Sequence, residues 1–263
     1  MGKKIAVISQ KGGVGKTTTV VNLGYCLADE GKKVLLIDMD PSRSLTCMLG
    51  LEKETFGIAE LLENTINKVP LPPKSDYVKE VNGIDCMPCT NKLTLIAQAI
   101  ITVPKNEMLF KRTIAGIASG YDYILVDCGS RLDLISVMIV AAVDGVILLT
   151  MPDMPAVYGI PAMVTSILKT KKSVNPDLEI DGVLITMFEK RTNLTKKVVE
   201  YIEEEFGKFL PVFKTRIPRS ITVNEALGEG QSIVRYQKGN MAAIAYREFA
   251  KEVLEIDRDK HVG

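Results

Sequence analysis

The fold of this 263-residue chain is decided by the stretch Gln10-Lys11-Gly12-Gly13-Val14-Gly15-Lys16-Thr17-Thr18. An apolar run at residues 3–9 precedes it and predicts a buried strand, and residues 19–28 follow with the apolar spacing of a helix. Strand, glycine-rich turn and helix form the context of a phosphate-binding loop, where successive backbone N–H groups point inward. We expect Lys16 to reach the β- and γ-phosphates and the Thr17 hydroxyl to hold Mg²⁺.

The composition bounds the class of protein. An apolar content of 46% argues against disorder, and a net charge of +1 means that nucleic-acid binding needs a local patch. No apolar stretch reaches transmembrane length, and no signal segment precedes the first strand. The five cysteines lack a regular spacing, which fits a reducing cytosol. We expect a soluble cytoplasmic protein whose length suits one α/β domain, residues 1–263, or at most two.

Acidic residues follow two further predicted strands. Residues 33–38 are apolar on both faces, as in a central parallel strand, and lead to Asp38 and Asp40. Residues 121–127 form a second such run, and its final residue, Asp127, suits Mg²⁺ held through a water. In open α/β sheets the carboxyl ends of the strands bind the ligand, so these acids are candidate site residues.

The remaining elements complete the predicted fold class, an α/β fold with a doubly wound, mostly parallel sheet flanked by helices. Further strands are predicted at residues 83–88, 143–150 and 180–187. Helices are predicted at residues 55–66, 93–119 with a break near Pro104, 156–172, 193–205 and 240–254, and a polar tail covers residues 256–263.

The glycine-rich loop departs from the standard pattern G-x-x-x-x-G-K-[ST], because Gln10 replaces the first glycine and Lys11 follows it. In this form the chain resembles the ParA/MinD family of deviant P-loop ATPases. The resemblance implies ATP and Mg²⁺ as ligands, with residues 12–18 around the phosphates. It also implies that Lys11 crosses to the partner subunit's phosphates in an ATP-sandwiched homodimer, as an arginine finger does.

The same resemblance assigns roles to the acids, and the chain departs from the family beside two of them. Asp40 orients or activates the attacking water and acts in catalysis with Lys11 and Lys16, while Asp38 supports Mg²⁺ and the switch region. Many members read Asp-Pro-Gln-Gly-Asn where this chain has Asp40-Pro41-Ser42-Arg43-Ser44. The family's Asp-x-Pro-Pro is here Asp127-Cys128-Gly129-Ser130. Both changes fall in switch segments, so we expect them to alter hydrolysis or its coupling to a partner.

Two later segments resemble the ParA branch of the family. The first runs from Met187 through Arg191-Thr192-Asn193-Leu194, where Thr192 or Asn193 caps a helix, and the second is Ile217-Pro218-Arg219. By resemblance, Met187, Pro218 and Arg219 lie at the nucleotide, the last two near the adenine. Basic residues in these positions bind DNA without sequence preference in partitioning members, by neutralising phosphates. The candidate DNA-binding residues are Arg191, Lys214, Arg216 and Arg219.

The function implied by the resemblance is ATP-driven DNA segregation. ATP with Mg²⁺ locks two subunits together, the dimer binds nucleoid DNA non-specifically, and a centromere-binding ParB-like protein stimulates hydrolysis and release. The cargo, whether plasmid, chromosome or integrated element, stays open. Because no helix-turn-helix precedes the first strand, operator-binding autorepression is not expected.

Two alternatives come from other branches of the resemblance. A MinD-like membrane-positioning ATPase needs an amphipathic C-terminal anchor, but residues 253–263 have no aromatic residue and carry three acids, so membrane attachment is disfavoured. An iron–sulfur carrier uses a C-x-x-C pair between subunits, and Cys86 and Cys89 have that spacing. A structural role for these two cysteines is the favoured interpretation.

Overall fold

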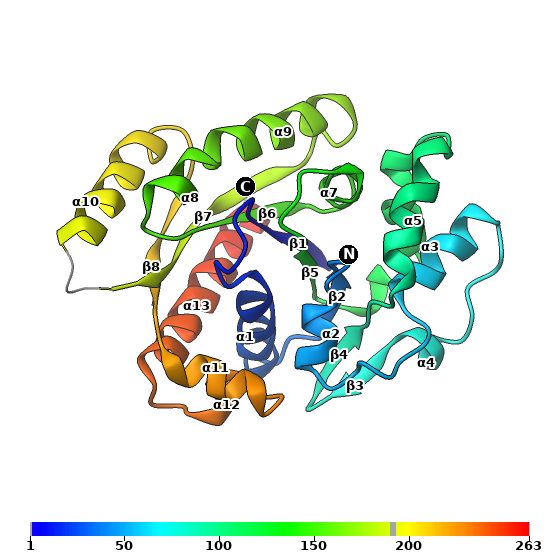
Figure 1. The fold of residues 1–263 in the computed structure, drawn as a ribbon, viewed down its shortest axis with the longest axis horizontal. Coiled ribbons are helices and arrows are strands. Elements are labelled where there is room, and N and C mark those ends of the chain that lie inside the picture. The colour runs from blue at the N-terminus through cyan, green and yellow to red at the C-terminus, as the bar shows by residue number, and fades with distance from the viewer. Residues whose placement is uncertain (1, 190–192, 263) are drawn as a thin grey trace.

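The computed structural model describes residues 2–189 and 193–262, and an eight-stranded sheet forms its centre (Figure 1). All neighbouring strands pair in parallel except β3 and β4, which are antiparallel. In spatial order the strands are β3 (Lys79–Val81), β4 (Ile84–Met87), β2 (Val34–Met39), β5 (Tyr123–Cys128), β1 (Lys3–Ile8), β6 (Gly145–Thr150), β7 (Glu179–Phe188) and β8 (Val212–Pro218). The predicted mostly parallel sheet is confirmed, and β3 and β8 are added to it.

The register of the central strands positions the candidate acids. β5 lies between β2 and β1, and all six residues of both β2 and β5 are buried, which explains their continuous apolar runs. In the β2–β5 pair, Asp38 stands opposite Asp127. On its other side, Asp127 stands opposite Val7 of β1, whose end leads into the glycine-rich loop. Three segments distant in sequence therefore meet at one edge of the sheet.

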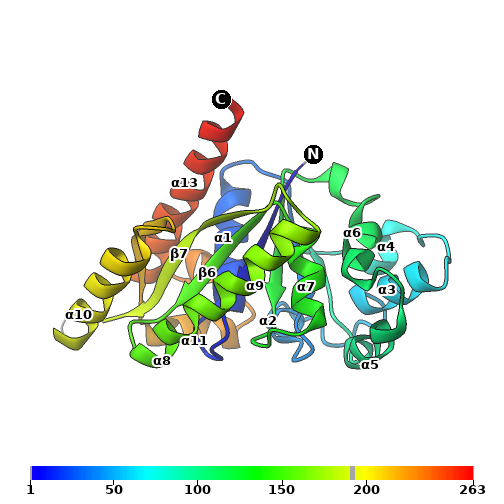
Figure 2. The ribbon, with the colours of Figure 1, turned by 90° about the horizontal axis from the view of Figure 1, so that it is seen from above.

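Helices cover both faces of the sheet, and a hydrophobic cluster lies under each layer (Figures 1 and 2). One layer contains α1, α12 and α13, and the other contains α3, α5, α6, α7 and α9. β1 shows the alternation: Ile5 and Val7 join one cluster, Ala6 and Ile8 the other. The helices are α1 (Lys16–Asp29), α2 (Ser44–Met48), α3 (Ile58–Ile66), α4 (Lys74–Tyr77), α5 (Lys92–Ala99), α6 (Leu109–Ile114), α7 (Leu134–Val140), α8 (Met154–Tyr158), α9 (Ile160–Ser173), α10 (Asn193–Tyr201), α11 (Ile221–Gly228), α12 (Ile233–Tyr236) and α13 (Met241–Val262).

Two predicted helices are divided in the structure. The region predicted at 93–119 consists of α5, α6 and the short 3₁₀ turns Ile100–Thr102, Asn106–Met108 and Ala118–Gly120, with Lys105 at a φ of 52° directly after Pro104. In place of the single helix predicted at 156–172, the structure has two helices, α8 and α9. Pro161 lies in the first turn of α9. Proline lacks the N–H that a continuous helix needs at that position.

The ends of two further predicted helices also differ. α10 continues as a short π-helical segment, Ile202–Phe206. Of the two predicted caps, Asn193 is the first residue of α10 and Thr192 lies outside the described residues. α13 extends to Val262, well past the predicted end at Leu254, so the segment predicted as a polar tail is helical. The ion pair between Lys3 and Asp257, at 2.5 Å, joins this end of α13 to β1. Within the described residues, none of the helices is both long and apolar enough to cross a membrane.

We predict that Gly57→Ala destabilises the fold by about 1–3 kcal/mol, the usual cost of overpacking. A Cβ at Gly57, which precedes α3, would stand 2.0 Å from the backbone oxygen of Pro88 at the end of β4. Urea unfolding measures the change, and Gly120→Ala is the matched control because nothing lies within 4 Å of its added Cβ. Equal stability of the two variants would contradict the close approach of α3 to β4.

Candidate functional site

The glycine-rich loop connects β1 to α1, and the first N–H groups of a helix have no partner within the helix. Gly13 and Gly15 have φ values of 75° and 86°, a left-handed conformation that suits glycine. Gly15 is also the N-cap of α1, and the first turn of α1 contains no acid to neutralise the helix start. The Thr186 hydroxyl of β7 donates to the Val14 carbonyl at 2.7 Å, which holds the loop against the sheet. The result is a preformed anion site.

Thr17 and Asp127 meet at the base of this loop. The Thr17 hydroxyl donates to Asp127 Oδ2 at 2.7 Å. Asp127 Oδ1 is buried and has no hydrogen-bond partner among the described residues. Burial raises the pKa of Asp127 well above its usual range, and the Asp38 carboxylate raises it further. A buried oxygen that lacks a partner, beside a threonine hydroxyl, fits a cation held directly or through water.

Asp38 organises the segment that follows β2. Its Oδ1 accepts from the Asp40 N–H at 3.1 Å, and its Oδ2 accepts from the Thr46 N–H at 2.8 Å and the Thr46 hydroxyl at 2.6 Å. Burial raises the pKa of Asp38 to about 6, although the Thr46 hydrogen bonds oppose this. Asp38 thus holds the start and the end of the segment 40–46 by hydrogen bonds, while its predicted roles toward the switch region and Mg²⁺ stay predictions.

Asp40 and Lys16 lie beside the segment that follows β5. Asp40 Oδ1 accepts from the Ser42 N–H at 2.9 Å, and an added Cβ at Gly129 would stand 3.6 Å from that oxygen. Lys16 is nearly buried, and its Nζ donates to Ser130 Oγ at 2.8 Å. The residues that depart from the family's second switch therefore pack inside the site. Ser130 as a partner of Lys16 was missed, because nothing in its spacing from Lys16 signals the contact.

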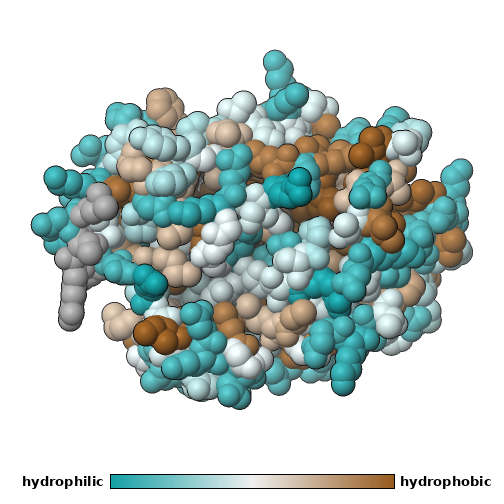
Figure 3. All heavy atoms as spheres, viewed as in Figure 1, coloured by the Kyte–Doolittle hydropathy of each residue, from teal (hydrophilic) through white to brown (hydrophobic). Residues whose placement is uncertain are grey.

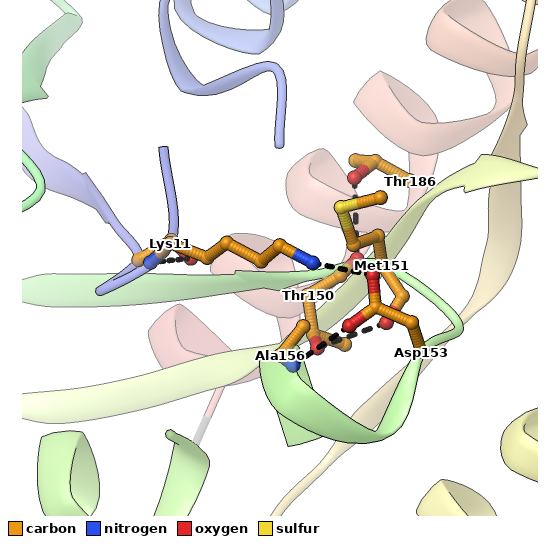
Figure 4. A network of polar contacts seen from close by, with 7 residues as sticks. Lys11, Thr150, Met151, Asp153, Ala156 and Thr186 are labelled. Carbon is orange, nitrogen blue, oxygen red and sulfur yellow. Dashed lines mark hydrogen bonds and ion pairs between the residues drawn. The ribbon is translucent and has the colours of Figure 1, made fainter. Parts of the chain in front are cut away.

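Lys11 points toward its own subunit's Asp153, at the start of α8 (Figure 4). Their side chains form an ion pair at 2.5 Å, and each is about one-third exposed. The other carboxylate oxygen of Asp153 accepts from the Ala156 N–H at 2.8 Å and caps α8. Asp153 is a further site residue that was missed, although an aspartate shortly before a proline in a helix start is a recognisable cap signal.

A cavity of about 550 Å³ opens between the glycine-rich loop and the ends of β7 and β8. Met187, Pro218 and Arg219, which the family resemblance places at the nucleotide, all line this cavity, and their contact with a nucleotide stays a prediction. Met187 has a φ of 52°, and its Cε lies 3.7 Å from where a Cβ on Gly15 would stand. The apolar part of the wall, which includes Ile217, Val223 and Tyr246, suits an aromatic base next to the phosphate loop.

The described candidates for DNA binding lie on or next to the edge strand β8, and Arg191 lies outside the described residues. Lys214 is exposed. Arg216 is paired with Glu203 and lies over the Phe188 ring, 5.4 Å from its centroid. Arg219 is 69% exposed and pairs with Glu189 at 2.9 Å. Two of these cations therefore stand beside acids, and DNA phosphates would have to compete with those acids.

The C-x-x-C pair lies in the core. Cys86 and Cys89 are fully buried, and Cys89 Sγ donates to the Thr90 carbonyl at 3.3 Å. Burial raises the pKa of both thiols, which disfavours the thiolates that an iron–sulfur cluster needs. Across residues 2–189 and 193–262, no cluster of three or more histidine, cysteine or acidic residues is arranged to hold a metal. The geometry favours the structural interpretation.

Residues 2–180 match the family model described as an AAA domain. The sporulation initiation inhibitor protein Soj of Bacillus subtilis (strain 168) is 36% identical over 257 residues, covering 96% of this chain and 98% of that protein. The chromosome partitioning protein ParA of Caulobacter vibrioides is 32% identical, covering 97% of this chain and 95% of that protein. The chain belongs to the ParA/MinD family of P-loop ATPases.

Solved structures of related folds agree with this assignment. The cobyrinic acid a,c-diamide synthase of Mycobacterium smegmatis, solved with bound ADP and magnesium, has a TM-score of 0.83 and 28% identity, covering 97% of this chain and 94% of that one. An ATP complex of Cyanothece McdA has a TM-score of 0.84 at 22% identity, covering 97% and 96%, and supports the fold alone.

We predict that Asp127→Asn stabilises the nucleotide-free protein, and more so at pH 8 than at pH 5. In the unfolded chain Asp127 ionises near its ordinary pKa of about 3.9, whereas burial raises the pKa in the fold. The folded state thus keeps a proton that the unfolded state has lost, and stability falls as pH rises from about 4 towards the raised pKa. Asparagine removes this loss and still offers an oxygen to Thr17.

The gain should be larger at pH 8 than at pH 5, because the pKa of Asp127 is raised in the fold. Urea unfolding at pH 5 and pH 8 with a chelator measures the gain. Asp76→Asn, on the exposed helix α4, is the control for a change of one surface charge. A gain that does not depend on pH would contradict the assignment of the raised pKa to Asp127.

Proposed function

We propose that the protein is a partition ATPase that dimerises around ATP and Mg²⁺, binds DNA without sequence preference, and releases it when a ParB-like activator stimulates hydrolysis. The observation that carries the proposal is Lys11, a cation next to the phosphate loop. Among the described residues its only anionic contact is Asp153, which is about one-third exposed. Similarity to Soj and ParA over nearly the whole chain supports the same cycle. The proposed location is the nucleoid in the cytoplasm.

ATP and Mg²⁺ fit the residues that are present. The loop N–H groups and Lys16 bind the phosphates, and the cavity beside Met187 and Pro218 receives the base. Thr17 and the unpartnered Oδ1 of Asp127 hold Mg²⁺, which neutralises developing phosphate charge when it is bound. Asp40 orients the attacking water. Because the described site has no histidine, catalysis rests on positioning and positive charge.

Dimerisation through the face that carries the site is supported by exposed apolar side chains. Leu132, Tyr158 and Ile221 are 40%, 70% and 77% exposed, and they follow the carboxyl ends of β5, β6 and β8. Figure 3 shows apolar side chains over α5 and α7 and a smaller group over α11 on the face viewed in Figure 1. A second copy would cover such side chains. In that dimer Lys11 exchanges Asp153 for the partner's phosphates.

The MinD-like alternative gains no support from the contacts of α13. A membrane anchor must be free to lie on the bilayer surface. Here α13 is joined near its end to the sheet, because Asp257 pairs with Lys3 and accepts from the Tyr123 hydroxyl. Phospholipid vesicles therefore serve as the comparison surface in the test of function.

We predict DNA binding that requires ATP and weakens steeply with salt. Fluorescence anisotropy on a random-sequence duplex, in ATP–Mg²⁺ and in ADP–Mg²⁺ across a salt series, measures it. Lys11→Ala should lose the ATP-dependent binding because the dimer does not form. Arg219→Glu should lose DNA affinity but still dimerise.

Arg235→Glu is the matched control for the charge change, since Arg235 is also an exposed arginine paired with an acid, Asp29, but lies on α12. Equal DNA affinity in ATP and ADP would contradict the proposed cycle. Absence of DNA binding together with ATP-dependent binding to anionic vesicles would replace it with the membrane-positioning function.

We predict that Asp40→Ala dimerises with ATP but does not hydrolyse it. The carboxylate contacts its own loop and the Gly129 segment, so its removal spares the phosphate loop and the base cavity. Size-exclusion chromatography with ATP and a phosphate-release assay measure the two properties, with Asp76→Ala as control. Hydrolysis at the wild-type rate would exclude Asp40 as the residue that orients water.

A further inference from the structure

Arg43 has an unfavourable backbone conformation in the segment that carries Asp40. Its φ is 59° and its ψ 29°, in the left-handed region that residues with a side chain rarely adopt. It stands where many family members have glycine, which adopts this region without a steric penalty. The arginine side chain must therefore contribute contacts that maintain the conformation.

The guanidinium group of Arg43 makes three hydrogen bonds to two other segments. Nε donates to the Cys89 carbonyl at 2.8 Å, and one terminal nitrogen donates to the Glu52 carbonyl at 2.8 Å. The other terminal nitrogen donates to Asn91 Oδ1 at 3.2 Å. These partners lie just after β4 and in the loop between α2 and α3. Because the guanidinium group is planar and its N–H donors have fixed directions, the three hydrogen bonds together allow only one orientation of the Arg43 side chain.

A second contact joins the same segment to Cys89 from the other side. The Cys89 N–H donates to Thr46 Oγ1 at 2.8 Å, and the Thr46 hydroxyl in turn donates to Asp38. Both backbone polar groups of Cys89 are thus bound by the segment 40–46, one through Arg43 and the other through Thr46. Asp40 lies at the start of this segment, and its carbonyl accepts from the Arg43 N–H at 2.9 Å.

We propose that Arg43 is a positioning residue for Asp40 in ATP hydrolysis. It fixes the turn that carries Asp40 against the end of β4, so that the carboxylate has one place relative to the γ-phosphate before the nucleotide binds. This inference rests on the proposed ATPase function. We call the three hydrogen bonds from Arg43 to Cys89, Glu52 and Asn91 the clamp. Because the clamp contacts neither the phosphate loop nor the base cavity, its loss affects the rate of hydrolysis and leaves ATP binding unchanged.

The test uses Arg43→Gly in the full-length chain. Glycine keeps the left-handed backbone without strain and removes all three hydrogen bonds, so folding is preserved while the clamp is lost. We expect kcat to fall about tenfold, within the range of up to about 100-fold that a misplacement of 1 Å can cause, with KM for ATP unchanged. Millimolar guanidinium ion should restore part of kcat, and the same concentration of ammonium ion should not.

Lys68→Gly is the matched control, because Lys68 is an exposed cation with a φ of 57° in the loop after α3. A second measurement, hydrogen–deuterium exchange of residues 42–47, reports on the clamp without activity. Exchange there should be about tenfold faster in Arg43→Gly than in the wild type and Lys68→Gly.

The outcomes separate the two proposals. Unchanged exchange in Arg43→Gly overturns the clamp, and a rise in KM with unchanged kcat overturns the positioning role. Failure of the wild-type protein to hydrolyse ATP contradicts the proposed function, while faster exchange in Arg43→Gly then still supports the clamp itself.

Discussion

The candidate site is organised around two carboxyl groups buried side by side at the carboxyl ends of β2 and β5. Asp38 and Asp127 are both 0% exposed, and the strand register pairs them directly. Two charges cannot be desolvated together without compensation, and burial accordingly raises the pKa of each. The Thr17 hydroxyl and the nearby Lys16 offset only part of the cost of burying the charge on Asp127. Asp38 and Asp127 together therefore favour an added cation at the phosphate loop.

Asp38 and Asp127 differ in their hydrogen bonds and therefore in what each can do at the site. Asp38 accepts three hydrogen bonds from its own segment and becomes a structural centre for Asp40 and Thr46. Asp127 keeps one oxygen without a partner among the described residues and faces Thr17. The position of Asp40 is therefore determined by a buried neighbour rather than by loop flexibility. Arg43 extends the same network to the segment that follows β4.

The sequence predicted the mostly parallel sheet, because buried parallel strands are continuous apolar runs. The acids at the ends of these runs lie together at one edge of the sheet, and their roles stay predictions. The contacts between distant segments could not be predicted. Ser130 is 114 residues from Lys16, and Asp153 is 142 residues from Lys11. The predicted end of α13 was wrong for the same reason. Its last residues are polar and indicate a tail, whereas in the structure Asp257 pairs with Lys3, which is far away in the sequence.

The two lysines of the loop differ in how firmly they are held, and this difference matches the two roles proposed for them. Lys16 is nearly buried against Ser130, whereas Lys11 and Asp153 are about one-third exposed. An ion pair that reaches solvent contributes only about 0.2–1 kcal/mol. A triphosphate from a second subunit carries several negative charges and can displace Asp153 at that cost. The side of the site that is proposed to exchange partners is thus weakly held. The side that is proposed to position water is fixed by the hydrogen bonds of Asp38.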